Sequence, residues 1–123
     1  MRVLIVDDHP AFRTALRAAL SMVDGFEVVG EAGGGVAACV CADELDPDVV
    51  VMDLSMPDLS GLDAMRRIHA RRPGVPVVIL TAHADPGIER EALQSGASGF
   101  VAKGIALGEL VAILGEATAR EPV

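Results

Sequence analysis

The stretch that decides the fold is Val49-Val50-Val51-Met52-Asp53-Leu54-Ser55-Met56-Pro57. Its four leading apolar residues show no polar alternation, which is typical of a parallel strand covered on both faces, and Asp53 falls at the carboxyl end of that strand. Open α/β sheets bind ligands at this end. A carboxylate here suits three roles: a nucleophile, a metal ligand or the cap of the next helix.

The composition indicates a small, acidic domain with an aliphatic core. The 123 residues, of which 51% are hydrophobic, are enough for one domain with a core that needs no disulfides or metal. Three Phe are the only aromatic residues, and the net charge is -8, so binding to nucleic-acid bases or phosphates is disfavoured. The chain enters an apolar strand at once and reaches Asp7 early, so we expect no signal peptide, no membrane span and a cytoplasmic location.

Two short motifs resemble ligand sites without having the required pattern. Cys39 and Cys41 lie two residues apart in a predicted helix, where their side chains diverge, so we expect free, partly buried thiols. The run Gly33-Gly34-Gly35 has neither the lysine ending of a phosphate loop nor the spacing of a dinucleotide fingerprint. We interpret it as a loose connection.

Strands and helices alternate five times along the chain. We expect strands at residues 2–7, 26–31, 49–53, 76–80 and 98–102, and a first helix at about 10–22. Four further helices follow the later strands; they are marked by Val36, Val40 and Leu45, by Leu62, Met65 and Ile68 after the cap Ser60, by the start Asp85-Pro86, and by Leu107, Leu110, Val111 and Leu114. This alternation predicts right-handed crossovers and a parallel sheet with helices on both faces.

A cluster of basic residues lies in the third predicted helix. Its members are mainly opposite the apolar stripe of that helix, and they are Arg66, Arg67, Arg71 and Arg72. We interpret the cluster as a solvated face, and we group His69 with it.

Four of the five predicted strands end in polar residues: Asp7-Asp8, Asp53, Thr81 and Lys103. Parallel strands bring these ends together. Three carboxylates in one cleft repel one another unless some are protonated or a divalent cation joins them, and oxygen ligands favour Mg²⁺ over Zn²⁺. Lys103 is the only lysine of the chain, and its ammonium with the Thr81 hydroxyl would complete a site for a phosphoryl group.

Four motifs with these residues follow one another along the chain: Asp7-Asp8-His9-Pro10, Met52-Asp53-Leu54-Ser55-Met56-Pro57, Leu80-Thr81-Ala82-His83 and Gly96-Ala97-Ser98-Gly99-Phe100-Val101-Ala102-Lys103. Together they resemble the receiver domain of bacterial two-component response regulators, and the resemblance covers nearly the whole chain. It is strongest to the NarL/FixJ subfamily, whose output is a LuxR-type helix-turn-helix. The resemblance implies one flavodoxin-like domain, with strand order 2-1-3-4-5 and an ordered core at about residues 2–118.

The resemblance also implies roles for the acidic residues. Asp53 would accept a phosphoryl group from a sensor histidine kinase, in a self-catalysed reaction that needs Mg²⁺ or Mn²⁺. Asp8, Asp53 and the backbone carbonyl of Ser55 would bind the ion, and Asp7 would act through water. Such a domain is a signalling phosphoacceptor and not an enzyme, and it can form homodimers through its first and last helices.

The remaining motif positions imply a switch. Thr81 would move toward the phosphoryl group, which Lys103 also contacts, and Phe100 matches the aromatic switch position. We further expect Ser55 and His83, which flank the path of water, to tune the lifetime of the acyl phosphate.

The chain departs from the family pattern in three places. Gly104 follows Lys103 where many receivers have proline, the triple glycine weakens the start of the second helix, and no output domain follows the last helix. We therefore expect looser placement of Lys103. We also expect an excised or stand-alone receiver, which would reach DNA only through an output domain outside this chain.

Several alternatives stay open at this level. Asp7 and Asp8 could cap the first helix, Thr81 could be an ordinary strand-end hydroxyl, and Phe100 could be plain core. His9 and His83 suit loop residues beside the site. The rival functions are a pseudo-receiver that works unphosphorylated and an aspartyl-phosphate phosphatase, although the latter needs an acid where Ser55 stands. A flavin-binding protein is disfavoured because acids follow the first strand.

Overall fold

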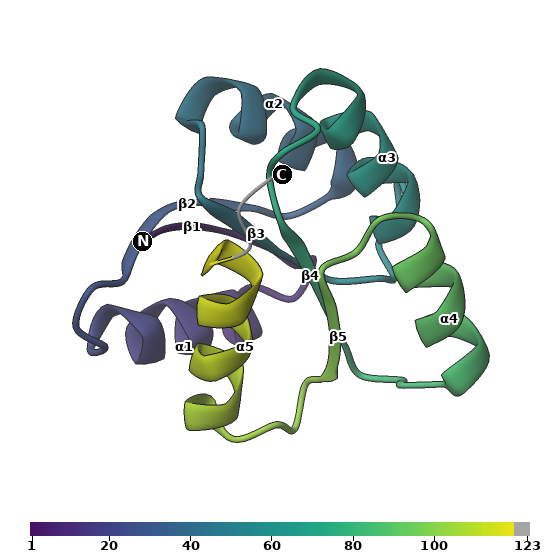
Figure 1. Ribbon diagram of the computed structural model, residues 1–123. Coiled ribbons are helices and arrows are strands. Elements are labelled where there is room, and N and C mark those ends of the chain that lie inside the picture. The colour runs from purple at the N-terminus through teal and green to yellow at the C-terminus, as the bar shows by residue number, and fades with distance from the viewer. Residues whose placement is uncertain (120–123) are drawn as a thin grey trace.

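The computed structural model describes residues 1–119, which form five strands alternating with five helices (Figure 1). The strands are β1 (Arg2–Val6), β2 (Glu27–Ala32), β3 (Val49–Met52), β4 (Val77–Thr81) and β5 (Gly99–Ala102). The helices are α1 (Pro10–Ser21), α2 (Gly35–Leu45), α3 (Gly61–Arg71), α4 (Pro86–Gln94) and α5 (Leu107–Ala119). None of these helices is long and apolar enough to cross a membrane. Residues 120–123, for which the sequence predicts a frayed tail after the last helix, lie outside the described residues.

All strand pairs are parallel, and the order across the sheet is β2-β1-β3-β4-β5, as predicted. In β3 every residue is buried, because its neighbours β1 and β4 cover both edges and helices cover both faces. This explains the run of valines without polar alternation. The carboxyl ends of β1 and β3 are level, since Val6 lies opposite Met52.

The two faces of the sheet carry separate layers of helices (Figure 1). On one face, α1 and α5 cover Val3, Ile5, Val49 and Val51. On the other, α2, α3 and α4 cover the alternate residues of the same strands, which are Leu4, Val6, Val50 and Met52. The alternation of side chains along each strand therefore fills two aliphatic cores.

The observed bounds of the strands and of the first helix differ from the expected ones by one residue at one or both ends. The strand expected at 76–80 is Val77–Thr81, because the Thr81 carbonyl still accepts a hydrogen bond from the Lys103 amide at 2.8 Å. The strand expected at 26–31 is Glu27–Ala32, and the first helix ends at Ser21.

Two predicted helix caps are confirmed. The Ser60 hydroxyl accepts a hydrogen bond from the Asp63 amide at the start of α3, and the Asp85 carboxylate accepts one from the Gly87 amide at the start of α4. Each cap satisfies an amide that the first turn of a helix leaves without a partner.

The expected loose start of α2 is wrong. Its first residue follows the N-cap Gly34, which has no side chain to act as a cap, but a carboxylate from another segment takes that place. Asp58 accepts hydrogen bonds from the amides of Gly35 and Val36, at 3.0 and 3.1 Å. The glycines give this carboxylate access to the helix end.

The interpretation of His69 as a surface residue is also wrong. Its ring is half-buried and its Nε2 lies 2.8 Å from the carbonyl oxygen of Val75, so the imidazole ties α3 to the segment before β4. Of the neighbouring arginines, Arg66 and Arg67 are exposed as expected, whereas Arg72 forms a 2.6 Å ion pair with Asp46.

Cys39 and Cys41 are free, half-buried thiols, as predicted. The Cys39 Sγ donates to the carbonyl oxygen of Ala64 at 3.8 Å. Burial raises the pKa of each thiol above the ordinary value of a cysteine. Both thiols are therefore protonated, and weakly nucleophilic, at neutral pH.

Gly61 provides a first test of how closely the backbone at Asp53 is packed. A Cβ there would lie 2.2 Å from the Asp53 carbonyl oxygen, so Gly61→Ala is expected to lower the free energy of unfolding by about 3 kcal/mol. Urea denaturation measures this change. The matched control is Gly74→Ala, since a Cβ at Gly74 meets no atom within 4 Å. Equal stability of the two variants would contradict the packing argument.

Candidate functional site

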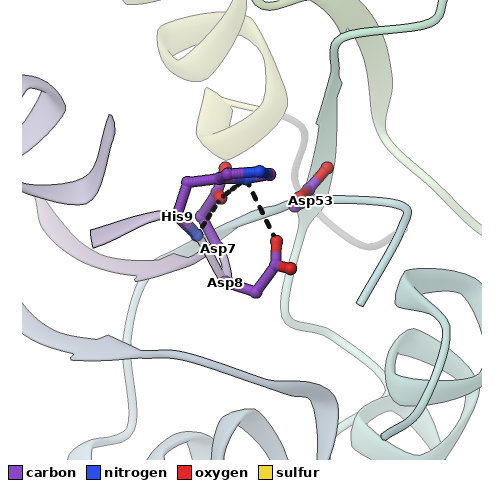
Figure 2. A group of neighbouring side chains, drawn as sticks. All are labelled: Asp7, Asp8, His9 and Asp53. Atoms are coloured by element: carbon purple, nitrogen blue, oxygen red, sulfur yellow. Dashed lines mark hydrogen bonds and ion pairs between the residues drawn. The ribbon is translucent and has the colours of Figure 1, made fainter. Parts of the chain in front are cut away.

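An acidic cluster lies where β1 and β3 end (Figure 2). Asp7 and Asp8 follow β1, Asp53 follows β3, and the Asp53 amide donates to the Val6 carbonyl at 2.8 Å, which holds the two strand ends together. One ligand atom each of Asp7, Asp8, His9 and Asp53 can be chosen so that all lie within 4.8 Å of one another. The predicted meeting of these three carboxylates is therefore observed.

His9 belongs to the cluster more closely than its sequence position indicated. Its Nδ1 lies 3.0 Å from Asp7 Oδ1 and 3.2 Å from Asp8 Oδ1, as the dashed lines in Figure 2 show. His9 is itself the N-cap residue of α1, which has no side-chain cap. The His9 backbone amide does donate to Asp7 Oδ1 at 2.8 Å, so Asp7 satisfies one donor at the start of α1 while its carboxylate also faces the cluster.

Lys103 provides the cation of the site. Its Nζ lies 2.6 Å from Asp7 Oδ2 and 3.5 Å from Asp53 Oδ2, so the lone lysine faces the acids as the sequence predicted, with its shorter contact to Asp7. The ammonium also lies 4.5 Å from the centre of the Phe12 ring, a cation–π distance. Phe12 was not predicted as a site residue; the available signal in the sequence was its position in the first turn of the helix after Asp7-Asp8.

Asp53 is almost fully buried, with 4% of its surface exposed. Burial raises the pKa of its carboxyl above the ordinary value and the Asp7 carboxylate raises it further, whereas Lys103 lowers it. One cation thus faces three carboxylates, and the ionised form of Asp53 is disfavoured until another positive charge arrives.

The donor set fits a hard divalent cation. Asp8 Oδ1 is buried and accepts no well-formed hydrogen bond; its nearest partner is His9 Nδ1, 3.2 Å away, which also contacts Asp7, so a cation or a water would complete the contacts of this oxygen. The carboxylate oxygens of Asp7, Asp8 and Asp53 are the ligand type that Mg²⁺ and Mn²⁺ prefer. The cluster can therefore bind a metal ion.

The other predicted site residues surround this cluster at different distances. Thr81 is buried at the end of β4, and its Oγ1 accepts a hydrogen bond from the amide of His83, whose side chain is exposed. Ser55 is exposed and lines an open depression together with Asp8. Phe100 is half-buried and packs against the core under α2, α3 and α4.

Comparison with protein families matches residues 3–115 to the response regulator receiver domain. The chain belongs to this family. The matched range begins in β1 and ends in α5, so this receiver has all five strands of the fold within the match. The predicted resemblance is confirmed.

Relatives of this receiver are bacterial regulators. Response regulator GacA of Pseudomonas viridiflava is 41% identical over 111 residues, which are 90% of this chain and 52% of that protein. Response regulator UvrY of Escherichia coli K12 is 38% identical over 114 residues, which are 93% of this chain and 52% of that protein. The chain spans about half the length of these relatives.

Solved structures agree with the fold of this receiver. The signal receiver domain of the putative response regulator NarL from Mycobacterium tuberculosis superimposes with a TM-score of 0.89 at 38% identity, covering 97% of each chain. The response regulator domain of Thermotoga maritima CheB reaches a TM-score of 0.91 at 34% identity, covering 99% of this chain and 98% of its own. The expected flavodoxin-like sheet and the similarity to the NarL/FixJ subfamily are both confirmed.

Proposed function

We propose that Asp53 accepts a phosphoryl group from a phosphohistidine of a sensor kinase, in a reaction that this receiver itself catalyses. The bond from phosphorus to the histidine nitrogen breaks as the bond to an Asp53 oxygen forms, and the imidazole stays with the kinase. The observation that carries the proposal is the buried Asp53 carboxylate with the Lys103 ammonium 3.5 Å away and Asp7 and Asp8 beside it. Nucleophile and counter-charge are thus already together.

Asp8, Asp53 and the backbone carbonyl of Ser55 would hold Mg²⁺ or Mn²⁺, and Asp7 would act through water. When bound, the ion neutralises charge on the phosphoryl oxygens, without which an anionic nucleophile could not approach them. The buried Asp8 Oδ1, whose one close contact is the His9 ring nitrogen shared with Asp7, and the raised pKa of Asp53 support this assignment.

Lys103 and Thr81 would bind the transferred group. Lys103 exchanges part of its contact with Asp7 for a phosphoryl oxygen. The Thr81 Oγ1 accepts from the His83 amide, so its own proton is left to donate to another phosphoryl oxygen. Movement of Thr81 with Phe100 would then change the surface formed by α4, β5 and α5.

The changed surface is the output of the domain. In this proposal the receiver works in the cytoplasm as a signalling phosphoacceptor with a histidine kinase as its partner, and α1 and α5 form a homodimer contact. Residues 1–123 constitute the receiver. Transcription is regulated through a DNA-binding output domain outside this stretch; this part of the proposal is supported by the length of GacA and UvrY, of which this chain spans about half.

The test is direct modification of the protein. Incubation with Mg²⁺ and a small-molecule phosphodonor is expected to add one phosphoryl group that is stable in acid and labile in base, as intact-mass spectrometry measures. Beryllofluoride with Mg²⁺ should shift the amide resonances of Thr81 and its neighbours. If the protein shows neither the modification nor the spectral response, the result would instead indicate the pseudo-receiver, which keeps the fold and works unphosphorylated.

The lifetime of the acyl phosphate tests the assigned role of His83. His83→Ala removes the exposed ring but keeps the backbone amide that holds Thr81. We expect dephosphorylation to slow by about threefold, less than the hundredfold of a firmly held general base, because the ring is exposed. Gln94→Ala, at an exposed position of α4, is the control. Equal decay rates of the His83 variant and the parent protein would exclude this role; Ser55→Ala tests the second tuning position in the same assay.

A further inference from the structure

The first turn of α2 has no cap from its own segment. Its N-cap is Gly34, and no acidic residue stands in its first turn. The first amides of a helix need acceptors from outside the helix, and the dipole of the helix favours a negative charge at this end. α2 therefore depends on another part of the chain for this stabilisation.

Asp58 supplies that cap from the loop after β3, which we define as residues 53–60. Its Oδ1 accepts from the Gly35 amide at 3.0 Å and its Oδ2 from the Val36 amide at 3.1 Å, so both carboxylate oxygens are used. These two hydrogen bonds lower the pKa of Asp58, first through Val36 and then through Gly35, so the carboxylate is ionised at neutral pH.

The glycines before α2 fit the loop so closely that side chains would disturb the contact. A Cβ on Gly34 would lie 2.8 Å from Asp58 Oδ1, and a Cβ on Gly35 would lie 2.7 Å from Leu59 Cβ and 2.9 Å from the Leu59 carbonyl oxygen. The glycines therefore stabilise this contact, because without side chains at Gly34 and Gly35 the backbone of α2 can pack directly against the loop.

The same loop carries Ser55, which lines the open depression beside Asp8. At its start, the loop is fixed by the hydrogen bond from the Asp53 amide to Val6. Near its end, it is fixed by the bond from the Gly61 amide to Leu54. Asp58 lies between these attachments and connects the middle of the loop to α2.

We propose that Asp58 is a positioning residue for the metal site: by tethering the loop to α2, it holds the Ser55 carbonyl where a divalent cation can use it. This inference rests on the metal site of the proposed function and extends it to a residue that contacts neither the ion nor the phosphoryl group. Groups that orient metal ligands without binding the ion can alter metal affinity by an order of magnitude.

The test compares three variants in Mg²⁺ titrations followed by amide chemical shifts of residues 53–60. Because the chain has no Trp or Tyr, NMR replaces intrinsic fluorescence. Asp58→Ala is expected to raise the Mg²⁺ dissociation constant by about tenfold and to lower the melting temperature. Asp58→Asn removes the charge but keeps an acceptor that can cap a helix, so its affinity should stay within about threefold of the parent.

The double variant Gly34→Asp/Asp58→Ala separates positioning from stability and from charge. The three atoms nearest to a Cβ at Gly34 all belong to the Asp58 carboxyl, which the second substitution removes, so an aspartate at 34 has room to cap α2 from within. This variant keeps the net charge and is expected to recover the melting temperature without recovering Mg²⁺ affinity, because the loop remains untethered.

Two results would overturn the positioning role alone: unchanged Mg²⁺ affinity in Asp58→Ala, or full recovery of affinity with melting temperature in the double variant. An affinity of Asp58→Asn as low as that of Asp58→Ala would overturn it too, since charge would then account for the loss. Failure of the parent protein to bind Mg²⁺ would overturn the metal site of the proposed function, and this inference with it.

Discussion

Replacing Asp53 with asparagine is expected to abolish modification by a small phosphodonor completely. The amide has almost the size of the carboxylate and keeps the backbone contacts, but its oxygen is too weak a nucleophile to attack phosphorus. Intact-mass spectrometry of the treated variant should show only unmodified protein. Asp63→Asn, at an exposed position of α3, is the control and should be modified as fully as the parent.

The same variant is expected to be more stable than the parent when no metal is present. Burial raises the pKa of Asp53 in the folded protein, so the folded state binds this proton more tightly than the unfolded chain does. The resulting stabilisation is present below the unfolded pKa and is lost as the pH rises through the folded pKa. At pH 7 the ionised carboxylate therefore costs stability, and asparagine removes that cost.

Thermal unfolding in the presence of a chelator measures this effect. The melting temperature of Asp53→Asn should exceed that of the parent at pH 7, and the difference should shrink as the pH falls below about 4, where the carboxyl is protonated in both states. A lower melting temperature at pH 7 would show that the contact with Lys103 outweighs burial and the repulsion from Asp7.

Lys103→Ala is expected to have the second-largest effect, because this one ammonium contacts both Asp7 and Asp53. Loss of a positioned cation at a phosphoryl site should lower the phosphorylation rate by about 100-fold or more. The variant also leaves the buried Asp7 without its partner, and breaking such a pair costs about 3 kcal/mol in the free energy of unfolding. Kinetics with a small phosphodonor and urea denaturation measure the two effects.

Two further variants show whether the charge or the shape of Lys103 accounts for the losses of phosphorylation rate and stability. Lys103→Arg keeps the charge but carries a planar, bulkier group, so it should retain much of the stability and little of the rate. Arg90→Ala, at an exposed position of α4, controls for removal of one positive charge. A Lys103→Ala variant that is phosphorylated at the parent rate would exclude Lys103 from the chemistry.

Most of the site was predictable because its signals are local. Buried parallel strands require long apolar runs, and such runs ending in Asp7-Asp8, Asp53, Thr81 and Lys103 identify both the strands and the edge where their ends meet. The strand order and the meeting of the carboxylates with Lys103 then agreed with expectation. The chemical roles of these residues, like those of Ser55, His83 and Phe100, remain predictions.

The predictions of burial and exposure were wrong where the neighbours of a residue belong to a segment distant in the sequence. In α2 the valines Val36 and Val40 are about half exposed, whereas Ala38 and Ala42 are buried, because the face of this helix that packs on the core carries the alanines. His69 has a partner before β4 that periodicity cannot reveal.

The sequence by itself determined the architecture and the reactive edge of this receiver, because hydrophobic runs and strand-end acids are properties of neighbouring residues. Only the tertiary structure decided which further side chains contact the strand-end residues and the start of α2. Phe12 lies beneath the Lys103 ammonium, His9 joins the carboxylates, and Asp58 caps α2 across 22 to 23 residues of chain. Such contacts depend on distances of a few ångströms between segments that only the packed sheet and helices bring together.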